Sequence, residues 1–144
     1  MKRGSRTGGG GFTLLELMIA LAIAAIVTAF ALPGYRMQIA RGHRADAIAA
    51  LYRAAQFVDS AAPDTGTLPA GLDQAPLSGA AVYRLSVSRG EEDGGYVIDA
   101  RPLETGPMRD DPCGVFRLDA TGARTNEPAS HAPAPTSGEC WRDR

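Results

Sequence analysis

The sequence contains few of the residues from which catalytic and metal centres are built. Among its 144 residues there are two histidines and two cysteines. His43 stands beside arginines in a helical pattern, and His131 lies in a Pro/Ala-rich stretch without a second metal-binding residue nearby. The carboxylates are scattered, and the tetraglycine at 8–11 lacks the Gly-Lys-Ser/Thr that completes a phosphate loop. We therefore expect no enzymatic activity, no bound metal and no cofactor.

The sequence also lacks an excess of positive charge. Lysine and arginine total 15 against 16 acidic residues, which gives a net charge of −1. Lys2 is the only lysine, so every later basic residue is an arginine. Nucleic-acid-binding domains usually carry clustered positive charge. The composition therefore argues against a general polyanion-binding protein.

One long apolar segment is present near the N-terminus. Residues 12–32 contain a single charged residue, Glu16, and the only other polar side chains are Thr13 and Thr28. A helix of these 21 residues would be about 31 Å long, enough to cross a hydrocarbon core of about 30 Å. An isolated charge at the centre of a bilayer costs about 2.5–3.5 kcal/mol. Glu16 is therefore a candidate functional residue.

A short basic leader precedes the apolar segment. It holds Lys2, Arg3 and Arg6 and no acidic residue. This charge distribution predicts a cytoplasmic N-terminus and a C-terminal remainder on the other side of the membrane. A secretory signal is cleaved at small residues that follow a shorter apolar region, whereas here the small residue, Gly11, stands before the run. Cleavage after Gly11 would leave the apolar helix on the mature protein.

These features resemble the N-terminus of the type IV pilins. In that family a prepilin peptidase cuts after a glycine, the new N-terminal phenylalanine is methylated, and a glutamate stands at the fifth position of the mature chain. Gly11, Phe12 and Glu16 match these positions, and Pro33 and Gly34 match the usual place of a helix kink. The resemblance implies an inner-membrane anchor that later joins other pilin subunits in a filament. Glu16 would then compensate the amine of Phe12 on its own or a neighbouring chain.

The remaining sequence predicts an α+β head. An alternating pattern predicts a strand at 81–89, and the Gly-rich turn after it predicts a hairpin with a second strand at 96–101. A third strand is predicted at 115–119, before Thr121 and Gly122, and a short fourth strand near 123–125. Residues 63–79 are rich in Pro, Gly, Ala and Asp and are predicted to be a loop. A type IV pilin fold, with a long helix on a three- or four-stranded antiparallel sheet, would bury both apolar faces. Beyond Pro33 the helix is expected to turn amphipathic, with its apolar face formed by Tyr35, Ile39, Ile48, Leu51, Tyr52, Ala55 and Val58.

Cys113 and Cys140 are the only cysteines, and the predicted topology places both outside the cytoplasm, where disulfides persist. A bridge that closes a loop of about 28 residues would contribute about 3–4 kcal/mol. Two free thiols or a metal pair are the alternatives. The pattern around the cysteines resembles the bridged D-region of PilE-type pilins, which implies a Cys113–Cys140 disulfide. Trp141 is expected to pack over the bridge or the sheet edge, and Asp110 and Asp111 to form a turn.

The resemblance also implies a division of the chain and a function. The expected parts are a leader (1–11), a transmembrane and filament-core helix (12–32), the amphipathic half of that helix (33–62) and a periplasmic head (63–144) with its D-region (113–140). The implied function is that of a structural subunit, a PilE-type minor pilin, of a type IV pilus that serves pilus biogenesis, twitching motility and adhesion. A type II secretion pseudopilin is the first alternative, although that class usually lacks a C-terminal disulfide loop.

Two further alternatives remain. One is a membrane-anchored periplasmic domain that never polymerises. The other is a pilin-like subunit that binds DNA for uptake, which requires a basic stripe on the head. Acidic residues interleave with several of the candidate arginines, so nucleic acid is the less favoured partner. The candidates are Arg84, Arg89, Arg101, Arg109, Arg117 and Arg124.

Overall fold

The computed structural model describes residues 11–61, 67–89, 95–129 and 135–142, without the side chain of residue 33. The chain divides between Met37 and Gln38 into two units. Helix α1 (Leu14–Ser60) contributes its first part to one unit and its second part to the other. The helix continues past the Pro-Gly pair, as the sequence pattern predicts, while the kink there stays a prediction.

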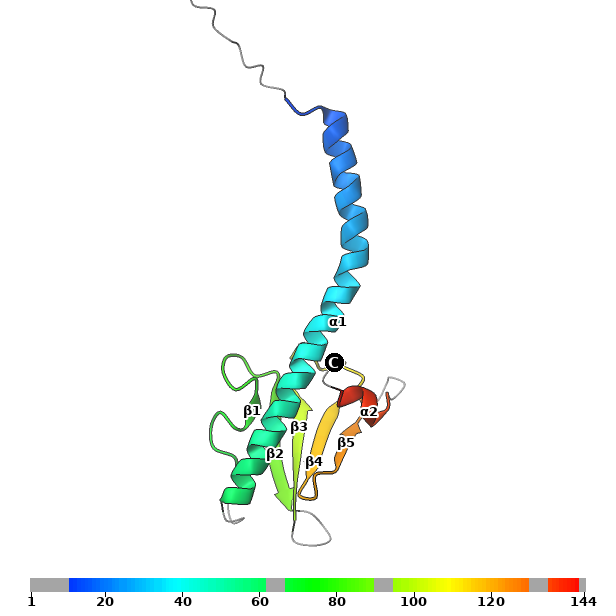
Figure 1. Ribbon diagram of the computed structural model, residues 1–144. Helices are drawn as coiled ribbons and strands as arrows, with labels where there is room; N and C mark the ends of the chain where they lie inside the picture. The colour runs from blue at the N-terminus through cyan, green and yellow to red at the C-terminus, as the bar shows by residue number, and fades with distance from the viewer. Residues whose placement is uncertain (1–10, 62–66, 90–94, 130–134, 143–144) are drawn as a thin grey trace, which may run out of the picture. The chain divides into compact units, whose positions relative to one another are not determined.

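The C-terminal unit is built on an antiparallel sheet in which each strand pairs with the next along the chain (Figure 1). The strands are β1 (Gln74–Ala75), β2 (Tyr83–Arg89), β3 (Tyr96–Pro102), β4 (Val115–Asp119) and β5 (Arg124–Glu127). The sheet therefore has five strands, where the sequence predicted three or four. The additional strand is β1, which lies in the segment that was predicted to be a loop. The remaining strands lie within a few residues of their predicted positions.

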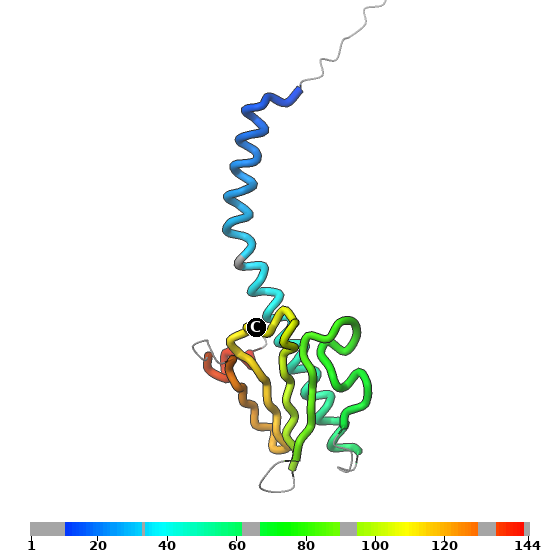
Figure 2. The backbone as a smooth tube through the Cα atoms, turned by 180° about the vertical axis from the view of Figure 1, so that it is seen from behind, coloured from blue at the N-terminus to red at the C-terminus, as the bar shows by residue number. Residues whose placement is uncertain are grey.

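The second part of α1 covers one face of this sheet, and Figure 2 shows the opposite face, with the strands in front of the helix. Ile48 and Leu51 are buried as expected, but Tyr52 is 43% exposed. Small side chains of α1 are buried beside them, which lets the helix lie close to the strands. The buried core includes Ala47, Ile48, Ala50, Leu51 and Ala54 of α1 together with Tyr83, Leu85, Ile98, Ala100, Phe116 and Leu118 of the sheet.

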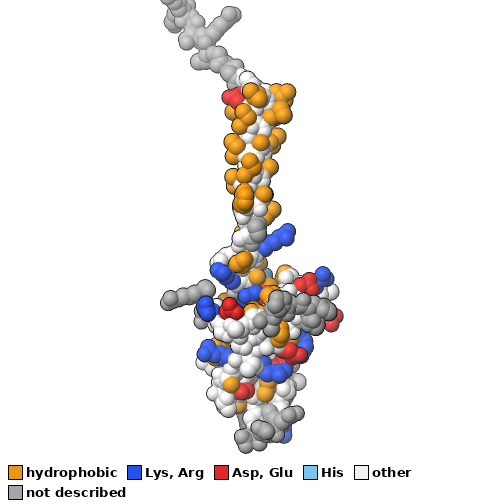
Figure 3. Space-filling model, turned by 90° about the vertical axis from the view of Figure 1, so that its right-hand side faces the viewer, with side chains coloured by type: hydrophobic (Ala, Val, Ile, Leu, Met, Phe, Trp, Pro, Cys, Tyr) orange, Lys and Arg blue, Asp and Glu red, His pale blue; other side chains and the backbone are white. Residues whose placement is uncertain are grey.

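The first part of α1 has a different character, since its side chains are exposed. Phe12, just before the helix, is 90% exposed, and the large apolar side chains from Leu14 to Ile39 are exposed on all sides of the helix. Figure 3 shows these apolar side chains along this part of the chain. Among the described residues, α1 is the one helix long and apolar enough to cross a membrane. A helix that is apolar all round is typical of a lipid-buried or protein-buried element. The predicted burial of Tyr35 and Ile39 on the head is wrong, because both are exposed.

A second, short helix precedes the C-terminus. Helix α2 (Ser137–Cys140) begins with a capping box: the Thr136 backbone N–H and Oγ1 both donate to Glu139 Oε2 at 3.0 Å. Such a reciprocal cap satisfies donors that the first turn of a helix leaves free. This helix was not predicted. It lies inside the segment bounded by the two cysteines and brings Cys140 to the buried core.

Candidate functional site

The start of α1 contains the residues to which the sequence assigned processing and assembly. Gly11, Phe12 and Glu16 are all exposed. Glu16 Oε2 accepts hydrogen bonds from the Thr13 backbone N–H at 2.9 Å and from its Oγ1 at 3.0 Å. In return, the Glu16 backbone N–H donates to Thr13 Oγ1 at 3.1 Å. Glu16 therefore caps its own helix. The pattern Thr-x-x-Glu signals this role in the sequence, although the sequence reasoning did not use it.

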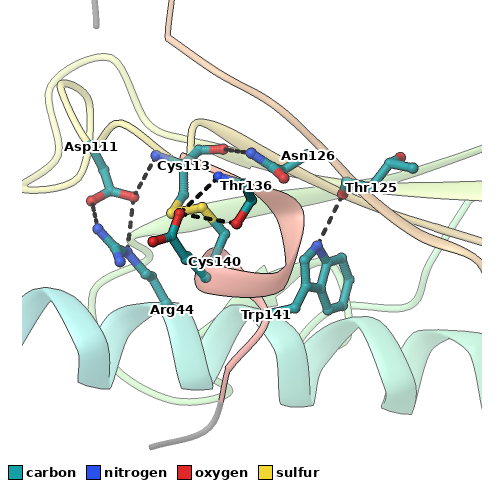
Figure 4. Close-up of a disulfide and its surroundings, with 9 residues drawn as sticks. Arg44, Asp111, Cys113, Thr125, Asn126, Thr136, Cys140 and Trp141 are labelled. Atoms are coloured by element: carbon teal, nitrogen blue, oxygen red, sulfur yellow. Dashed lines mark hydrogen bonds and ion pairs between the residues drawn. A yellow bond between two sulfur atoms is a disulfide. The ribbon is translucent and has the colours of Figure 1, made fainter. Parts of the chain in front are cut away.

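The C-terminal segment is held by a disulfide between Cys113 and Cys140, with an S–S distance of 2.03 Å. Both cysteines are only 1% exposed. Figure 4 shows the bridge between the chain that leads into β4 and helix α2. The Asn126 amide donates to the Cys113 carbonyl at 3.2 Å, which ties β5 to the same place. The bridge thus joins the last helix to the centre of the head.

Trp141 follows directly and packs against the sheet edge, as expected. Its ring meets Phe116 edge to face, with centroids 5.4 Å apart, and its indole N–H donates to the Thr125 carbonyl at 3.2 Å. The Arg124 guanidinium lies 6.0 Å from the ring centroid, which is within reach of a cation–π contact. Trp141 is 7% exposed. The tryptophan is therefore a core residue, not an exposed stacking platform.

A partly buried ion pair, which the sequence reasoning did not find, links α1 to the chain before β4. Arg44 donates through Nε to Asp111 Oδ2 at 3.1 Å and through Nη2 to Oδ1 at 2.5 Å. Asp111 also shapes its own turn, because its carbonyl accepts the Gly114 N–H and its carboxylate accepts the Cys113 N–H. The turn predicted at this position is present, but Asp111 has this additional long-range partner.

Aspartates neutralise half of the six candidate arginines. Three of them form ion pairs: Arg84 with Asp73 at 2.7 Å, Arg109 with Asp110 at 2.8 Å and Arg117 with Asp99 at 2.7 Å. Hydrogen bonding to Asp99 raises the pKa of Arg117 above its usual value. Arg89 and Arg101 are exposed and form no ion pair with another described residue, and Arg124 lies at the Trp141 ring.

Two cavities flank α2, and arginines line both. One has a volume of about 270 Å³ and is lined by Arg41, Arg44, Glu139, Cys140 and Arg142. The other has a volume of about 240 Å³ and is lined by Arg124, Ser137, Gly138 and Trp141. Arg41 and Arg142 are 101 residues apart in the sequence, so no local sequence pattern predicts that they line the same cavity. Within the described part of the chain, no group of three or more His, Cys, Asp or Glu side chains is arranged to hold a metal.

A long N-terminal helix with an apolar first part, a meandering antiparallel sheet on its second part and a disulfide-bounded C-terminal segment define a type IV pilin. Residues 8–32 match the prokaryotic N-terminal methylation motif. Residues 33–117, which are 85 of the 144, match the family described as "Type IV minor pilin ComP, DNA uptake sequence receptor". The chain therefore belongs to this family of type IV minor pilins, which are structural subunits.

Two other comparisons accompany this match. Among solved structures, a type IV pilin from Shewanella oneidensis is 25% identical, with a TM-score of 0.41 over 67% of this chain and 98% of that one. No curated protein sequence matches the chain. The family match ends at Arg117, so β5, α2 and Cys140 lie beyond it.

Proposed function

We propose that this minor pilin binds DNA on the pilus surface and serves DNA uptake. The observation that carries this proposal is the match of residues 33–117 to a family described as a DNA uptake sequence receptor. The match includes most of the head that the structure describes. The composition made nucleic acid the less favoured partner, and the family match reverses this preference. The match also favours a pilus subunit over a type II secretion pseudopilin.

The charge distribution of the head supports contact with DNA at a few local sites. Blue and red side chains are interspersed on the face drawn in Figure 3. On the sheet, Arg84 of β2 stands directly opposite Arg101 of β3. Like charges in such cross-strand pairs destabilise a sheet. Asp73 neutralises Arg84, whereas Arg101 has no ion pair with a described residue. A DNA phosphate beside Arg101 would relieve this repulsion.

Such a surface implies weak, salt-sensitive binding. Each phosphate contact lowers the logarithm of the affinity by about 0.9 per tenfold increase in salt, because bound counterions are released. Non-specific complexes of this kind have dissociation constants of about 10⁻⁴–10⁻⁶ M at physiological salt. A preferred sequence would add base contacts to this electrostatic contribution.

Fluorescence anisotropy of a labelled duplex with the full chain in a non-ionic detergent tests the proposal. We expect saturable binding that weakens as salt rises. Arg101→Gln should lose more affinity than Arg109→Gln, which removes the same charge where Asp110 already compensates it. Repeated selection from a random duplex pool then reports whether one sequence is enriched. Absence of salt-sensitive binding by the unaltered chain contradicts the proposal.

Biogenesis of this subunit follows from its N-terminus. The methylation motif and the apolar part of α1 indicate anchoring in the inner membrane before assembly. Within our proposal, prepilin peptidase removes residues 1–11 between Gly11 and Phe12, and Phe12 is methylated. Residues 12–32 then span the membrane, with the head in the periplasm, before entering the filament core. Residues 33–62 form the second half of the helix, and residues 63–144 form the head with the D-region 113–140.

Assembly with other pilin subunits is the proposed role of Glu16. Removal of the leader leaves a positive amine on Phe12, four residues before the carboxylate. Pairing the two charges in the apolar filament core would offset the desolvation of both. The cap from Thr13 is compatible with this role, because Thr13 occupies only one of the two carboxylate oxygens in the hydrogen bonds described above. Twitching motility and adhesion are proposed consequences of membership in the pilus.

A further inference from the structure

Two exposed side chains follow closely on the apolar segment of residues 12–32. Tyr35 is 66% exposed, and Arg36 beside it is exposed as well. Arg36 forms no ion pair with another described residue, and the sequence holds no acidic residue between Glu16 and Asp46. Neither side chain is buried within the chain, so both are accessible to a partner outside it. We refer to Tyr35 and Arg36 as the exit pair.

The distance of the exit pair from the apolar segment corresponds to the headgroup layer of a membrane. Helix α1 is continuous over Leu14–Ser60, so each residue adds about 1.5 Å along its axis. Tyr35 therefore lies about 4.5 Å and Arg36 about 6 Å beyond Leu32. A bilayer is about 40–45 Å thick with its headgroups and about 30 Å thick without them, which leaves about 5–7 Å for the headgroups on each side. When residues 12–32 span the hydrocarbon core, both side chains lie among the headgroups.

The chemistry of the exit pair suits this layer. Tyrosine is enriched at membrane–water interfaces because its ring is apolar and its hydroxyl is polar. Leu32, one helical turn before Arg36, is 49% exposed and extends the apolar surface up to the pair. The methylene chain of an arginine can cover such a surface while its guanidinium stays in the polar layer. That guanidinium presents paired N–H donors, which match the phosphate of a phospholipid.

Glu16 and Arg36 favour opposite displacements of the helix along the membrane normal. Glu16 lies four residues after Phe12, which places it about 6 Å inside the other end of the apolar segment. A charged carboxylate is costly in the hydrocarbon, so Glu16 draws the helix toward the side of its N-terminus. The same displacement would move Arg36 out of the headgroups and into the hydrocarbon, which is costly as well. Arg36 therefore limits how far the helix can move.

We propose that the exit pair binds the headgroups of an anionic phospholipid and so fixes the depth of the helix before assembly, which rests on the membrane span proposed above. Anionic lipids give the membrane surface a negative potential, and this potential attracts a nearby arginine. Removal of residues 1–11 takes away the basic residues on the other side of the span. Arg36 is then the basic side chain nearest to the span, and it holds the processed subunit at its depth until the subunit enters a filament.

The depth of the helix in a bilayer tests this proposal. A nitroxide on the cysteine of Ala29→Cys reports depth through its collisions with oxygen and with a water-soluble nickel chelate. The two native cysteines form the disulfide and do not react with the label. The full chain is reconstituted in vesicles of phosphatidylcholine and phosphatidylglycerol. Arg36→Gln should let the label move deeper by up to about 6 Å, the distance that brings Glu16 to the opposite surface. Tyr35→Ala should cause a smaller shift in the same direction, and Arg36→Lys none.

Two control variants separate the charge of Arg36 from other effects. Arg109→Gln removes a positive charge from the head, where Asp110 compensates it, and should leave the label in place. Glu16→Gln removes the opposing charge, so adding it to Arg36→Gln should restore the depth found in the unaltered chain. A folding defect cannot produce such a reversal. In phosphatidylcholine alone the shift caused by Arg36→Gln should be smaller, because a surface without net charge attracts Arg36 less.

The same measurement identifies the results that contradict the proposal. A label that lies in the hydrocarbon at one depth in the unaltered chain and all variants overturns the exit pair as an anchor and leaves the membrane span standing. If those variants are then depleted from sheared pili, the pair contacts a neighbouring subunit instead. An equal shift in phosphatidylcholine alone overturns the anionic headgroup as the partner. A label exposed to water in the unaltered chain overturns both the anchor and the span.

Discussion

Arg44 on α1 and Asp111 before β4 form a bidentate ion pair between segments 67 residues apart in the sequence. Their side chains are 23% and 5% exposed, so Asp111 is nearly withdrawn from water. The same aspartate organises the turn that leads to Cys113. One carboxylate thereby connects the helix, the β3–β4 connection and the disulfide.

Removal of either partner of this pair should destabilise the head. Asp111→Asn leaves Arg44 with an uncompensated charge in a partly buried place, and we expect a loss of about 2–3 kcal/mol in the free energy of unfolding. The matched control is Asp73→Asn, because the Arg84–Asp73 pair is 53% and 32% exposed and should contribute about 0–1 kcal/mol. Urea unfolding measures both values. Equal losses in the two variants would contradict the structural role of Asp111.

Gly114 should tolerate no side chain. Its φ of +59° lies in the left-handed region, and an added Cβ would overlap the Glu127 carbonyl and lie 2.8 Å from the Ala129 nitrogen. The left-handed backbone alone costs a non-glycine residue about 1–2 kcal/mol, and the overlap with rigid backbone adds to this. Gly122 has a φ of +82° but nothing within 4 Å of such a Cβ. We therefore expect Gly114→Ala to lower the melting temperature clearly more than Gly122→Ala.

The strands were predictable where side chains alternate, and the helix termini where capping residues stand at fixed spacing. Val115–Asp119 was predicted to the residue, and its apolar and polar positions alternate from Phe116 to Asp119. Gln74–Ala75 has only two residues, too few to show a period, and its strand exists because it pairs with β2. Two capping boxes, Thr13 with Glu16 and Thr136 with Glu139, were visible in the sequence but were not recognised.

Packing between distant segments was the part that sequence patterns could not supply. The predicted apolar face of α1 relied on large side chains and included Tyr52, whereas Ala47, Ala50 and Ala54 form much of the buried face. Alanine is compatible with both buried and exposed positions, so the sequence does not show which alanines of the helix face the sheet. The cavity of about 270 Å³ beside α2 likewise depends on the disulfide, because Cys140 is part of its lining and is bonded to Cys113.

Tyr96 should make the stability of the head depend on pH in the alkaline range. Its hydroxyl donates to Asp59 Oδ1 at 2.9 Å, and burial followed by this hydrogen bond raises its pKa to about 12. The unfolded value is about 10. The folded state therefore holds the proton more tightly, so the stabilisation is complete below pH 10 and is lost as pH rises toward 12.

Urea midpoints of the unaltered chain and Tyr96→Phe across this range measure the effect. We expect the midpoint of the unaltered chain to fall more steeply with pH than that of Tyr96→Phe. Tyr83, whose pKa burial also raises, is present in both proteins and cancels in the comparison. Asp59→Asn keeps an acceptor but removes the charge, so it should show an intermediate slope. Parallel curves for all three proteins would rule out Tyr96 as the titrating group.

Gly11→Ser should block removal of the leader, because the cleavage proposed after residue 11 requires the small glycine. The expected product is a chain that is inserted in the membrane but retains residues 1–11 and is absent from pili. Mass spectrometry of membrane and sheared-pilus fractions reports the N-terminus and its methylation. A mature N-terminus at Phe12 in this variant would refute the assignment.

Glu16 offers a way to separate helix capping from charge compensation. Glu16→Gln preserves the Thr-x-x-Gln capping pattern but removes the negative charge, whereas Thr13→Ala removes the cap and preserves the charge. If Glu16 pairs with the amine of Phe12 during assembly, Glu16→Gln should insert in the membrane but be depleted from sheared pili as strongly as Glu16→Ala. Thr13→Ala should then be incorporated almost normally, since the carboxylate is still available. Quantitative immunoblots of membrane and pilus fractions measure both steps. Normal incorporation of Glu16→Gln together with depletion of Thr13→Ala would assign Glu16 to the cap, because only the hydrogen bonds at the helix start, and not the charge, would then matter for assembly.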